Sequence, residues 1–360
     1  ARDRIAAARE HVDGFGVATE CGWGRGGAEA VEGLLELHRE LAVPLDGDDG
    51  TVWPAGFDPV PDQPWTTEAL DSAGVAHDHV EGHGWYANLD PTVEDLTADL
   101  HAGDILLDYS GGSGILVERL RRRIGDRQVG TLIVDPSPTF LRIALEKFRS
   151  DPLIGLRLLE GSLDDALGPD LAGRGVDAVV STNAIHLYPD FDAVAAAWAR
   201  VLRPGGRVYL SSGNVMDPGG RRDWLLDQTV EAIDERARDL VRSDRTYERY
   251  EPLLRDRELL ERHAAIRRQA FPAPRPLGDY VAALTVAGLG VKHMREATID
   301  ASVHEWFDFL SAFHGTVLGW IPEERVHDRL RLMRQAMEVL FAQRPTFAAG
   351  WTYITAEKPG

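Results

Sequence analysis

The sequence predicts a doubly wound α/β domain built on a mostly parallel sheet, and three observations predict it. Short apolar runs rich in branched residues alternate with helical stretches between residues 106 and 215. A knot of small residues, SGGSG at 110–114, joins the first run to the first helix after it. The tight turn RPGG at 203–206 joins a later helix to the run that follows. Strands covered on both faces by crossover helices have this near-continuous apolar character.

The expected strands and helices follow one another along the chain. A helix at 90–100 starts the series, with Asp90 as N-cap and Pro91 at the first helical position. The expected strands are 105–110, 131–137, 156–162, 177–183, 207–213, 290–299 and 347–358. The other expected helices are 115–124, 139–148, 191–202 and 276–289. A ligand is expected outside the carboxyl ends of the strands, beside the glycine-rich turn.

The chain divides into a core with additions at its start and within its second half. The expected segments are a helical and extended N-terminal appendage at 1–90, the α/β core at 91–216, a charged helical cap insertion at 217–275, and the completion of the core at 276–360 with a helical insertion at 302–343. Within the appendage, residues 44–66 are dense in Pro, Gly and Asp, which is typical of a linker or covering loop.

Composition limits the class of protein. The formal charge is −19, so a polyanion would be repelled, and we expect no nucleic-acid partner. The chain has one cysteine, Cys21, which excludes an internal disulfide and a metal site made of several thiolates. No apolar run approaches the roughly 20 residues that cross a bilayer, and the charged start is unlike a signal peptide. We expect a cytoplasmic protein with no membrane partner.

Three ligand classes use a strand, a glycine turn and a helix N-terminus: phosphates, dinucleotides and S-adenosylmethionine (SAM). A P-loop would need Lys and Ser or Thr at the end of the turn, but Gly114 is followed by Ile115 and Leu116. A dinucleotide turn needs a further glycine where Ile115 or Val117 stands, which weakens this class without excluding it. SAM contains no phosphate, so it suits a bare turn flanked by carboxylates.

Several ordered motifs resemble those of the class I SAM-dependent methyltransferases. They are LLDYSGGSG, LIVDPS, LLEGSLDD and the stretch STNAIHLYPDFDAVAAAWARVLRPGGRVYLSSG. The resemblance covers residues 91–215 and extends to the closing helices and strands of 276–356. It implies a Rossmann-like seven-stranded sheet and SAM as the cofactor. Ser110 and Ser162 stand where the family more often has glycine and aspartate. The implied cofactor-binding residues are Asp108, Ser110, Gly111, Gly112, Gly114, Asp135, Pro136, Ser162, Leu163 and Asn183.

Two carboxylates are central to this expectation. Asp135 ends the second strand and can accept charge-assisted hydrogen bonds from both ribose hydroxyls. Its alternative role is to cap the helix that follows Pro136. Asp108 is expected to orient the glycine turn and, directly or through water, the ammonium of the ligand.

His186 is the implied catalytic residue. IHLYPD at 185–190 resembles the turn that carries the general base in the O-methyltransferase branch, with Leu187 and Tyr188 in place of its usual Asp-Trp. A base of this kind predicts a rate that rises with pH through the ordinary histidine range. Packing against SAM is an alternative role. A metal held with His293 or His314 is another, but no metal-ligand spacing occurs and we expect no metal.

The acceptor is expected to be a small molecule enclosed by the helical cap. The side chains expected to line its pocket are Tyr86, Tyr188, Trp224, Tyr250 and His314. The predicted function is SAM-dependent methyl transfer to an O, N or C nucleophile of a small organic acceptor in specialised metabolism. Alternatives are a SAM enzyme with different chemistry, or a non-catalytic SAM-binding or regulatory module. The sequence leaves a homodimer open.

The segment around the single cysteine stands outside this family. GVATECGWGRGG resembles the cysteine-bearing zinc segment of cobalamin-independent methionine synthase over about thirty residues, but the other zinc ligands are absent. A buried thiol in a glycine-rich turn is the favoured interpretation of Cys21.

Overall fold

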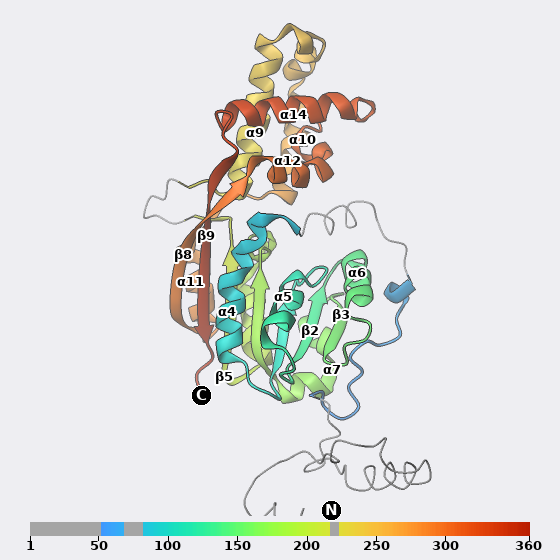
Figure 1. Ribbon diagram of the computed structural model, residues 1–360, viewed down its shortest axis with the longest axis vertical. Helices are drawn as coiled ribbons and strands as arrows, with labels where there is room; N and C mark the ends of the chain where they lie inside the picture. The colour runs from blue at the N-terminus through green and yellow to red at the C-terminus, as the bar shows by residue number, and fades with distance from the viewer. Residues whose placement is uncertain (1–51, 68–81, 217–222) are drawn as a thin grey trace, which may run out of the picture. The chain divides into compact units, whose positions relative to one another are not determined.

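The computed structural model describes residues 52–67, 82–216 and 223–360, and a seven-stranded sheet organises them (Figure 1). Its strands are β1 (Ile105–Tyr109), β2 (Gly130–Asp135), β3 (Ile154–Leu158), β4 (Val176–Thr182), β5 (Leu202–Ser212), β8 (Gly290–Ser302) and β9 (Thr346–Glu357). Their order is β3-β2-β1-β4-β5-β9-β8, and only β9 runs antiparallel to its neighbours. The predicted doubly wound, mostly parallel, seven-stranded sheet is confirmed.

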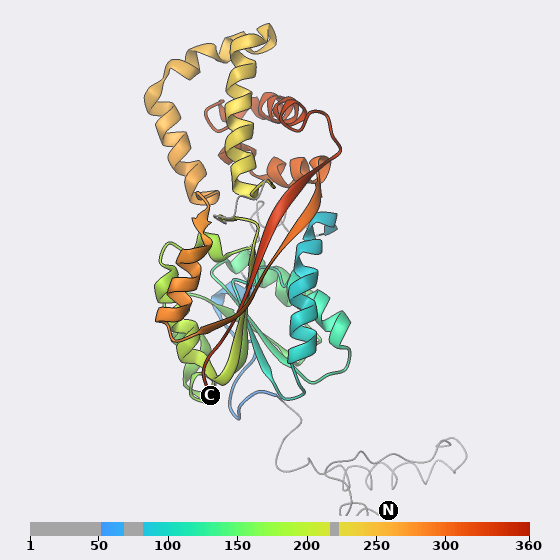
Figure 2. The same cartoon turned by 90° about the vertical axis from the view of Figure 1, so that its left-hand side faces the viewer.

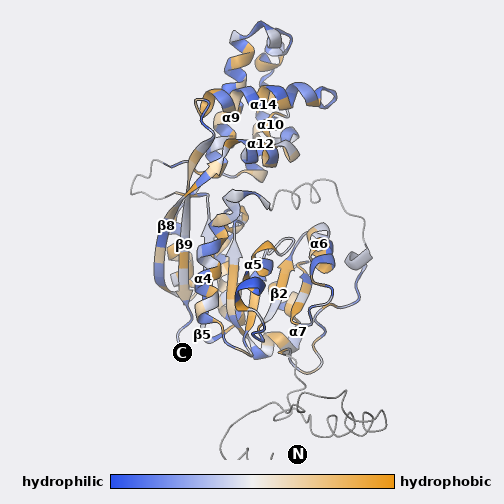
Figure 3. Cartoon of the chain, viewed as in Figure 1, coloured by the Kyte–Doolittle hydropathy of each residue, from blue (hydrophilic) through white to orange (hydrophobic). Residues whose placement is uncertain are grey.

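Helices cover both faces of the sheet, as Figure 2 shows. One face carries α4 (Asp90–Asp99), α5 (Ile115–Ile124) and α6 (Pro138–Phe148), and the other carries α7 (Leu163–Arg174), α8 (Phe191–Val201) and α11 (Leu277–Val286). Strand β1 illustrates why. Leu106 packs in the first layer, whereas Ile105 and Leu107 pack in the second, so the strand is buried throughout. Figure 3 shows the resulting apolar strands between amphipathic helices.

The two predicted helical insertions pack together as one cap. The cap consists of α9 (Leu226–Ser243), η7 (Arg245–Arg255), α10 (Arg257–Ala270), α12 (Val303–Ala312), α13 (His314–Val317), η8 (Glu323–Arg325) and α14 (Val326–Leu340). Asp234 on α9 is 1% exposed and ties them together. It accepts a hydrogen bond from Trp320 at 2.7 Å and pairs with Arg267 of α10.

Two connections carry the cap on the α/β domain. Short strands β6 (Val215–Met216) and β7 (Arg275–Pro276) pair with each other, one leading toward the cap and one returning from it. The long hairpin of β8 and β9 brackets the second insertion. Trp306 of α12 also meets Trp85 edge-on at 5.9 Å, so the cap and the domain share one hydrophobic core.

Near the start of the described chain, one feature differs from the sequence expectation, and a second shows where residues 52–67 lie. Asp90 is not an N-cap, because the turn η5 (Gly84–Leu89) delivers the chain already in helical conformation, and its carboxylate instead pairs with Arg119 at 2.8 Å. Residues 52–67 pack on the sheet, with Trp53 and Trp65 buried in two of its core layers. Residues 1–51 of the predicted appendage, with Cys21, lie outside the described residues.

Within the described ranges, no helix is both long and apolar enough to cross a membrane.

Candidate cofactor and active site

The glycine turn lies between β1 and α5 and has an exposed backbone. Ser110, Gly112 and Gly114 all have positive φ, at 59°, 58° and 84°. A Cβ at Gly111 would lie 2.6 Å from the carboxyl carbon of Asp108, so that position requires glycine. A Cβ at Gly112 would meet no heavy atom within 4 Å, which leaves the backbone of this residue open to a ligand.

Asp108 lies directly beneath this turn at 1% exposure. Neither of its carboxylate oxygens has a hydrogen-bond partner among the described residues. Burial, and next the nearby Asp135, raise the pKa of Asp108 to about 8. Because buried carboxylates almost always have partners, this carboxyl is available to a donor from outside the described residues.

Asp135, at the end of β2, connects the turn to the next helix. One carboxylate oxygen accepts from the N–H of Gly112 at 2.9 Å and the other from the N–H of Ser137 at 2.8 Å. Burial raises its pKa to about 6, and these two hydrogen bonds partly oppose the shift. Pro136 is exposed beside it. Ser137 itself caps α6, so Asp135 supports the start of that helix as well as the turn.

The residues expected around the adenine follow β3. The Ser162 hydroxyl accepts from the N–H of Asp165 at 3.2 Å and donates to its carboxylate at 2.6 Å, which makes Ser162 the N-cap of α7. Leu163 begins the helix and is 3% exposed. Their part in cofactor binding stays a prediction.

Asn183 directly follows β4 and has the left-handed conformation, with φ of 57°. Its side-chain amide donates to the Oδ1 of Asn88 at 3.1 Å, and its Oδ1 accepts from the indole N–H of Trp351 at 3.1 Å. Asn183 therefore ties β4 to η5 and β9. The Asn183 side chain is occupied by Asn88 and Trp351. Its contact with the cofactor stays a prediction.

His186 lies in a short 3-10 turn after β4, and α9 of the cap approaches it. Its Nδ1 lies 3.0 Å from the Ser212 hydroxyl, and its Nε2 lies 3.9 Å from Oδ2 of Asp227. That Oδ2 accepts from the side-chain amide of Asn214 at 2.8 Å. Burial lowers the pKa of His186 to about 4 and raises that of Asp227 to about 8. At neutral pH both groups are therefore uncharged.

Two of the residues expected to line the acceptor pocket lie on the α/β domain. The Tyr188 hydroxyl lies 2.9 Å from the Ser181 hydroxyl, below the glycine turn. Tyr86 is 4% exposed and stacks on Trp85 at 4.0 Å between centroids. Their contact with an acceptor stays a prediction.

The other three lie at separate places around the cap. Trp224 bridges to β9 beside Ala349, and its ring meets Phe341. Tyr250 is buried and donates its hydroxyl to Asp328 at 2.5 Å. His314 begins α13 next to Arg329. The described contacts do not bring these three side chains together, and their predicted role is untested.

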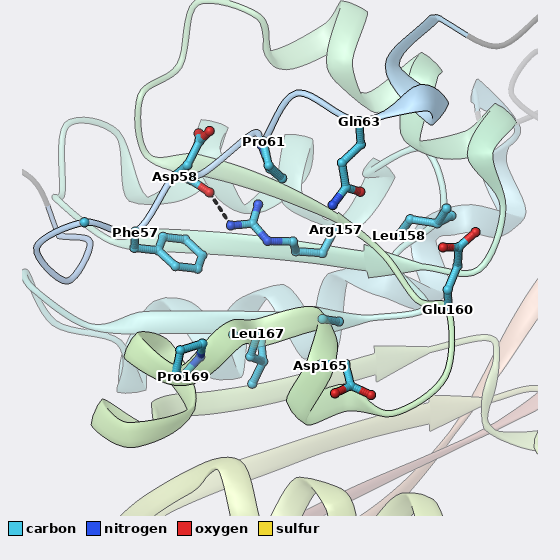
Figure 4. A pocket seen from close by; sticks show the side chains of 13 residues that line it. Phe57, Asp58, Pro61, Gln63, Arg157, Leu158, Glu160, Asp165, Leu167 and Pro169 are labelled. Carbon is cyan, nitrogen blue, oxygen red and sulfur yellow. Dashed lines mark hydrogen bonds between the residues drawn. The ribbon is translucent and has the colours of Figure 1, made fainter.

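A cavity of about 360 Å³ lies along β3 rather than at the glycine turn (Figure 4). Arg157 crosses it, stacks over Phe57 at 4.5 Å and donates to the Pro59 carbonyl at 2.6 Å. The guanidinium is thus used to hold residues 52–67 on the edge of the sheet. No potential metal-binding group of three or more His, Cys, Asp and Glu side chains occurs among the described residues.

The sequence interpretation missed the partners of His186. Ser212 ends β5 and Asn214 lies two residues further on, in the letters SSGN. Polar residues at the carboxyl end of a parallel strand are a usable signal. Asp227 has no such signal, because an acid in the first turn of a helix is ordinary.

The strand order, the glycine turn after β1 and the carboxylates of Asp108 and Asp135 are the features of a Rossmann-like cofactor-binding domain. Residues 106–206 match the family model described as a methyltransferase domain. These residues therefore carry a methyltransferase domain.

Curated relatives match the same part of the chain. Nocamycin O-methyltransferase of Saccharothrix syringae is 30% identical over 129 residues, which are 36% of this chain and 44% of that protein. The ubiquinone/menaquinone biosynthesis C-methyltransferase UbiE of Shewanella halifaxensis is 29% identical over 115 residues, 32% of this chain and 44% of that protein. The chain thus spans under half the length of these relatives.

A solved structure with a similar fold is a putative sarcosine dimethylglycine methyltransferase from Galdieria sulphuraria. It is 16% identical and aligns with 80% of this chain and 99% of that chain at a TM-score of 0.47.

Proposed function

We propose that the chain transfers the methyl group of SAM to a small organic acceptor in specialised metabolism. The observation that carries the proposal is the pairing of an unpartnered, buried Asp108 carboxyl with an open backbone at Gly112. This combination suits a ligand that has a cation and hydrogen-bonding groups but no phosphate. The formal charge of −19 agrees with a small acceptor and opposes a nucleic acid.

The residues present fit SAM at the turn. Gly112 lets the amino-acid part approach its Cα closely, while its N–H is held by Asp135. Asp108 offers an acceptor to the ammonium. Asp135 retains lone pairs for the ribose hydroxyls, because each of its oxygens accepts only one backbone hydrogen bond here. When bound, SAM supplies an electrophilic methyl group for in-line displacement. The protein contributes alignment and exclusion of water.

His186 is the proposed general base. With Nδ1 hydrogen-bonded to Ser212, its Nε2 is the ring nitrogen left for an acceptor proton. The uncharged imidazole can accept that proton without first losing one. Asp227 lies beside the same nitrogen, beyond hydrogen-bond distance at 3.9 Å, and is supplied by the cap. The cap thereby contributes a polar group beside the proposed reaction centre.

Transfer of label from methyl-labelled SAM tests this function. The purified chain is incubated with labelled SAM and small-molecule extracts, and the low-molecular-weight products are separated from macromolecules. We expect label in a small organic product. Label in nucleic acid or protein, or cleavage of SAM with no labelled acceptor, contradicts the proposal.

A further inference from the structure

Asn214 lies where the end of β5 meets both connections of the cap. It is two residues after Ser212, directly before β6, and is 1% exposed. Its backbone N–H donates to the Ser212 hydroxyl at 3.0 Å. That hydroxyl lies 3.0 Å from Nδ1 of His186. The backbone of Asn214 therefore supports the contact that orients the imidazole.

The side chain of Asn214 binds the cap at two places that are distant in the sequence. Its Nδ2 donates to Oδ2 of Asp227, in the first turn of α9, at 2.8 Å. The same nitrogen donates to the carbonyl of Pro272, just after α10, at 2.9 Å. One amide thus binds the chain both where it enters the cap and where it leaves it.

The orientation of this amide is maintained by its contacts with the cap. The Oδ1 of Asn214 is buried and has no hydrogen-bond partner among the described residues. A buried acceptor without a partner is unfavourable, so the two hydrogen bonds that Nδ2 donates must outweigh this loss. Turning the amide over would place its oxygen against the Pro272 carbonyl, which can only accept.

The neighbouring backbone strengthens the same junction. The N–H of Leu226, the first residue of α9, donates to the Gly213 carbonyl at 3.1 Å. A Cβ at Gly213 would lie 2.8 Å from the ring of Trp351 on β9, so the backbone here packs directly against the indole. The first turn of α9 is therefore joined to the end of β5 by one backbone and one side-chain hydrogen bond.

We propose that Asn214 is a positioning residue, which holds Asp227 beside Nε2 of His186 and thereby fixes the position of the cap relative to the proposed base. Nε2 lies 3.9 Å from Oδ2 of Asp227, and this oxygen is the atom that Asn214 binds. Asn214 itself needs to touch neither the cofactor nor the acceptor. Its effect on methyl transfer rests on the proposed function, whereas its contact with the cap can be tested without any substrate.

Modification of His186 by diethyl pyrocarbonate tests this contact, because the reagent acylates accessible, uncharged imidazoles. The His186 side chain is only 13% exposed in the structure. Asn214→Ala removes both side-chain hydrogen bonds to the cap, so the rate of modification at His186, followed by peptide mass spectrometry, should rise roughly five- to fiftyfold. The rate at His101, which is 81% exposed, should stay the same. An unchanged rate at His186 in the folded variant overturns the inference.

Two variants at Asp227 test the contact from the side of the cap, and they do so even where Asn214→Ala fails to fold. Asp227→Leu keeps bulk beside His186 but removes the acceptor, so it should also raise the rate. Its combination with Asn214→Ala should react at most about twofold faster than Asn214→Ala alone. Asp227→Asn keeps an oxygen that can accept from Asn214 and should react like wild type. Effects that multiply in the double variant, or a fast rate in Asp227→Asn, overturn the inference.

Thr229→Val is the matched control for a general weakening of the cap. Thr229 lies on α9 two residues after Asp227, is fully buried and accepts from the indole N–H of Trp306 at 2.8 Å. The variant removes a buried hydrogen bond from the same helix, so it should lower the melting temperature yet leave the rate at His186 within about twofold of wild type. A rate as high as that of Asn214→Ala would show that any weakening of α9 exposes His186, and would overturn the specific role of Asn214.

Methyl transfer measures the functional consequence of the contact. At saturating substrates, Asn214→Ala should lower kcat roughly ten- to a hundredfold, because a small displacement from the reactive geometry has an effect of this size. Affinity for S-adenosylhomocysteine should stay within about twofold of wild type, since Asn214 does not reach the glycine turn. A wild-type kcat overturns the positioning role. Failure of the wild type to transfer methyl contradicts the proposed function, whereas the rates of modification still decide whether Asn214 holds the cap against His186.

Discussion

Nδ1 of His186 lies 3.0 Å from the Ser212 hydroxyl, and this contact leaves Nε2 as the ring nitrogen for the proposed role as a base. The Ser212 oxygen is itself held by the N–H of Asn214 at 3.0 Å. The imidazole is therefore oriented by the end of β5, and Nε2 points toward Asp227 of the cap. His186 is thus held by a residue of the α/β domain on one side and faced by a residue of the cap on the other, as expected for a site that both parts of the chain form.

The first prediction concerns His186 and pH. Burial lowers its pKa to about 4, so the imidazole is neutral throughout the neutral range and kcat/KM should be flat across the ordinary histidine range. The sequence alone predicted that the rate would rise through the ordinary histidine range. With the lowered pKa of His186, that rise in rate should occur near pH 4. His186→Ala should reduce turnover by about 10² to 10⁴, with S-adenosylhomocysteine affinity nearly intact. Equal turnover at saturating substrate would contradict the base role.

Asp227 should make stability depend on pH. Its pKa is raised from 3.8 to about 8, so the folded protein keeps a proton that the unfolded chain releases above about 4. The stability associated with this group therefore falls as pH rises from about 4 to about 8. Asp227→Asn has no proton to lose, so it should escape this loss. The difference in melting temperature, variant minus wild type, should therefore increase by a few degrees from pH 5 to pH 8. Asp126→Asn, at an exposed position, is the control. A difference in melting temperature between Asp227→Asn and wild type that stays constant with pH would contradict the raised pKa of Asp227.

Asp135 should matter more for the cofactor than a simple helix cap would. Asp135→Ala removes two hydrogen bonds to the turn and α6 as well as the proposed ribose acceptor. We expect S-adenosylhomocysteine affinity to fall by roughly 1.5–3 kcal/mol, the range for hydrogen bonds to a charged group. Calorimetry measures the loss, and Ser137→Ala, which removes the α6 cap alone, is the control. Equal affinities in wild type and Asp135→Ala would leave Asp135 as a cap only.

Asp108 should couple ligand binding to proton release. Its pKa is about 8 in the free protein, and an ammonium placed beside it would favour the ionised form. Affinity for S-adenosylhomocysteine should therefore rise between pH 6 and pH 8, with protons released on binding. Calorimetry in buffers of different ionisation enthalpy counts those protons. Affinity that is constant over this pH range would mean that Asp108 stays protonated or is not contacted.

The sheet and its glycine turn could be predicted because each strand is a local apolar run. Helix α7 was not predicted, since Gly168 and Pro169 interrupt its pattern and Gly168 has a non-helical φ of 68°. The end of β4 was placed correctly, yet the sequence could not show that Asn183 is bound to Asn88 and Trp351, which come from distant parts of the chain. The approach of Asp227 to His186 could not be predicted either, because it depends on how α9 packs against the α/β domain.

The most direct test of this account is a calorimetric comparison of S-adenosylhomocysteine with NAD on the same protein. Both ligands carry adenosine, but only NAD needs a turn that cradles a pyrophosphate. The unpaired carboxyl of Asp108 beneath the turn favours a ligand that places an ammonium there and opposes one that places a pyrophosphate there. We predict saturable binding of S-adenosylhomocysteine, weakened in Asp135→Ala, and no comparable binding of NAD. Binding of NAD in preference to S-adenosylhomocysteine would contradict the assignment of this chain to SAM chemistry.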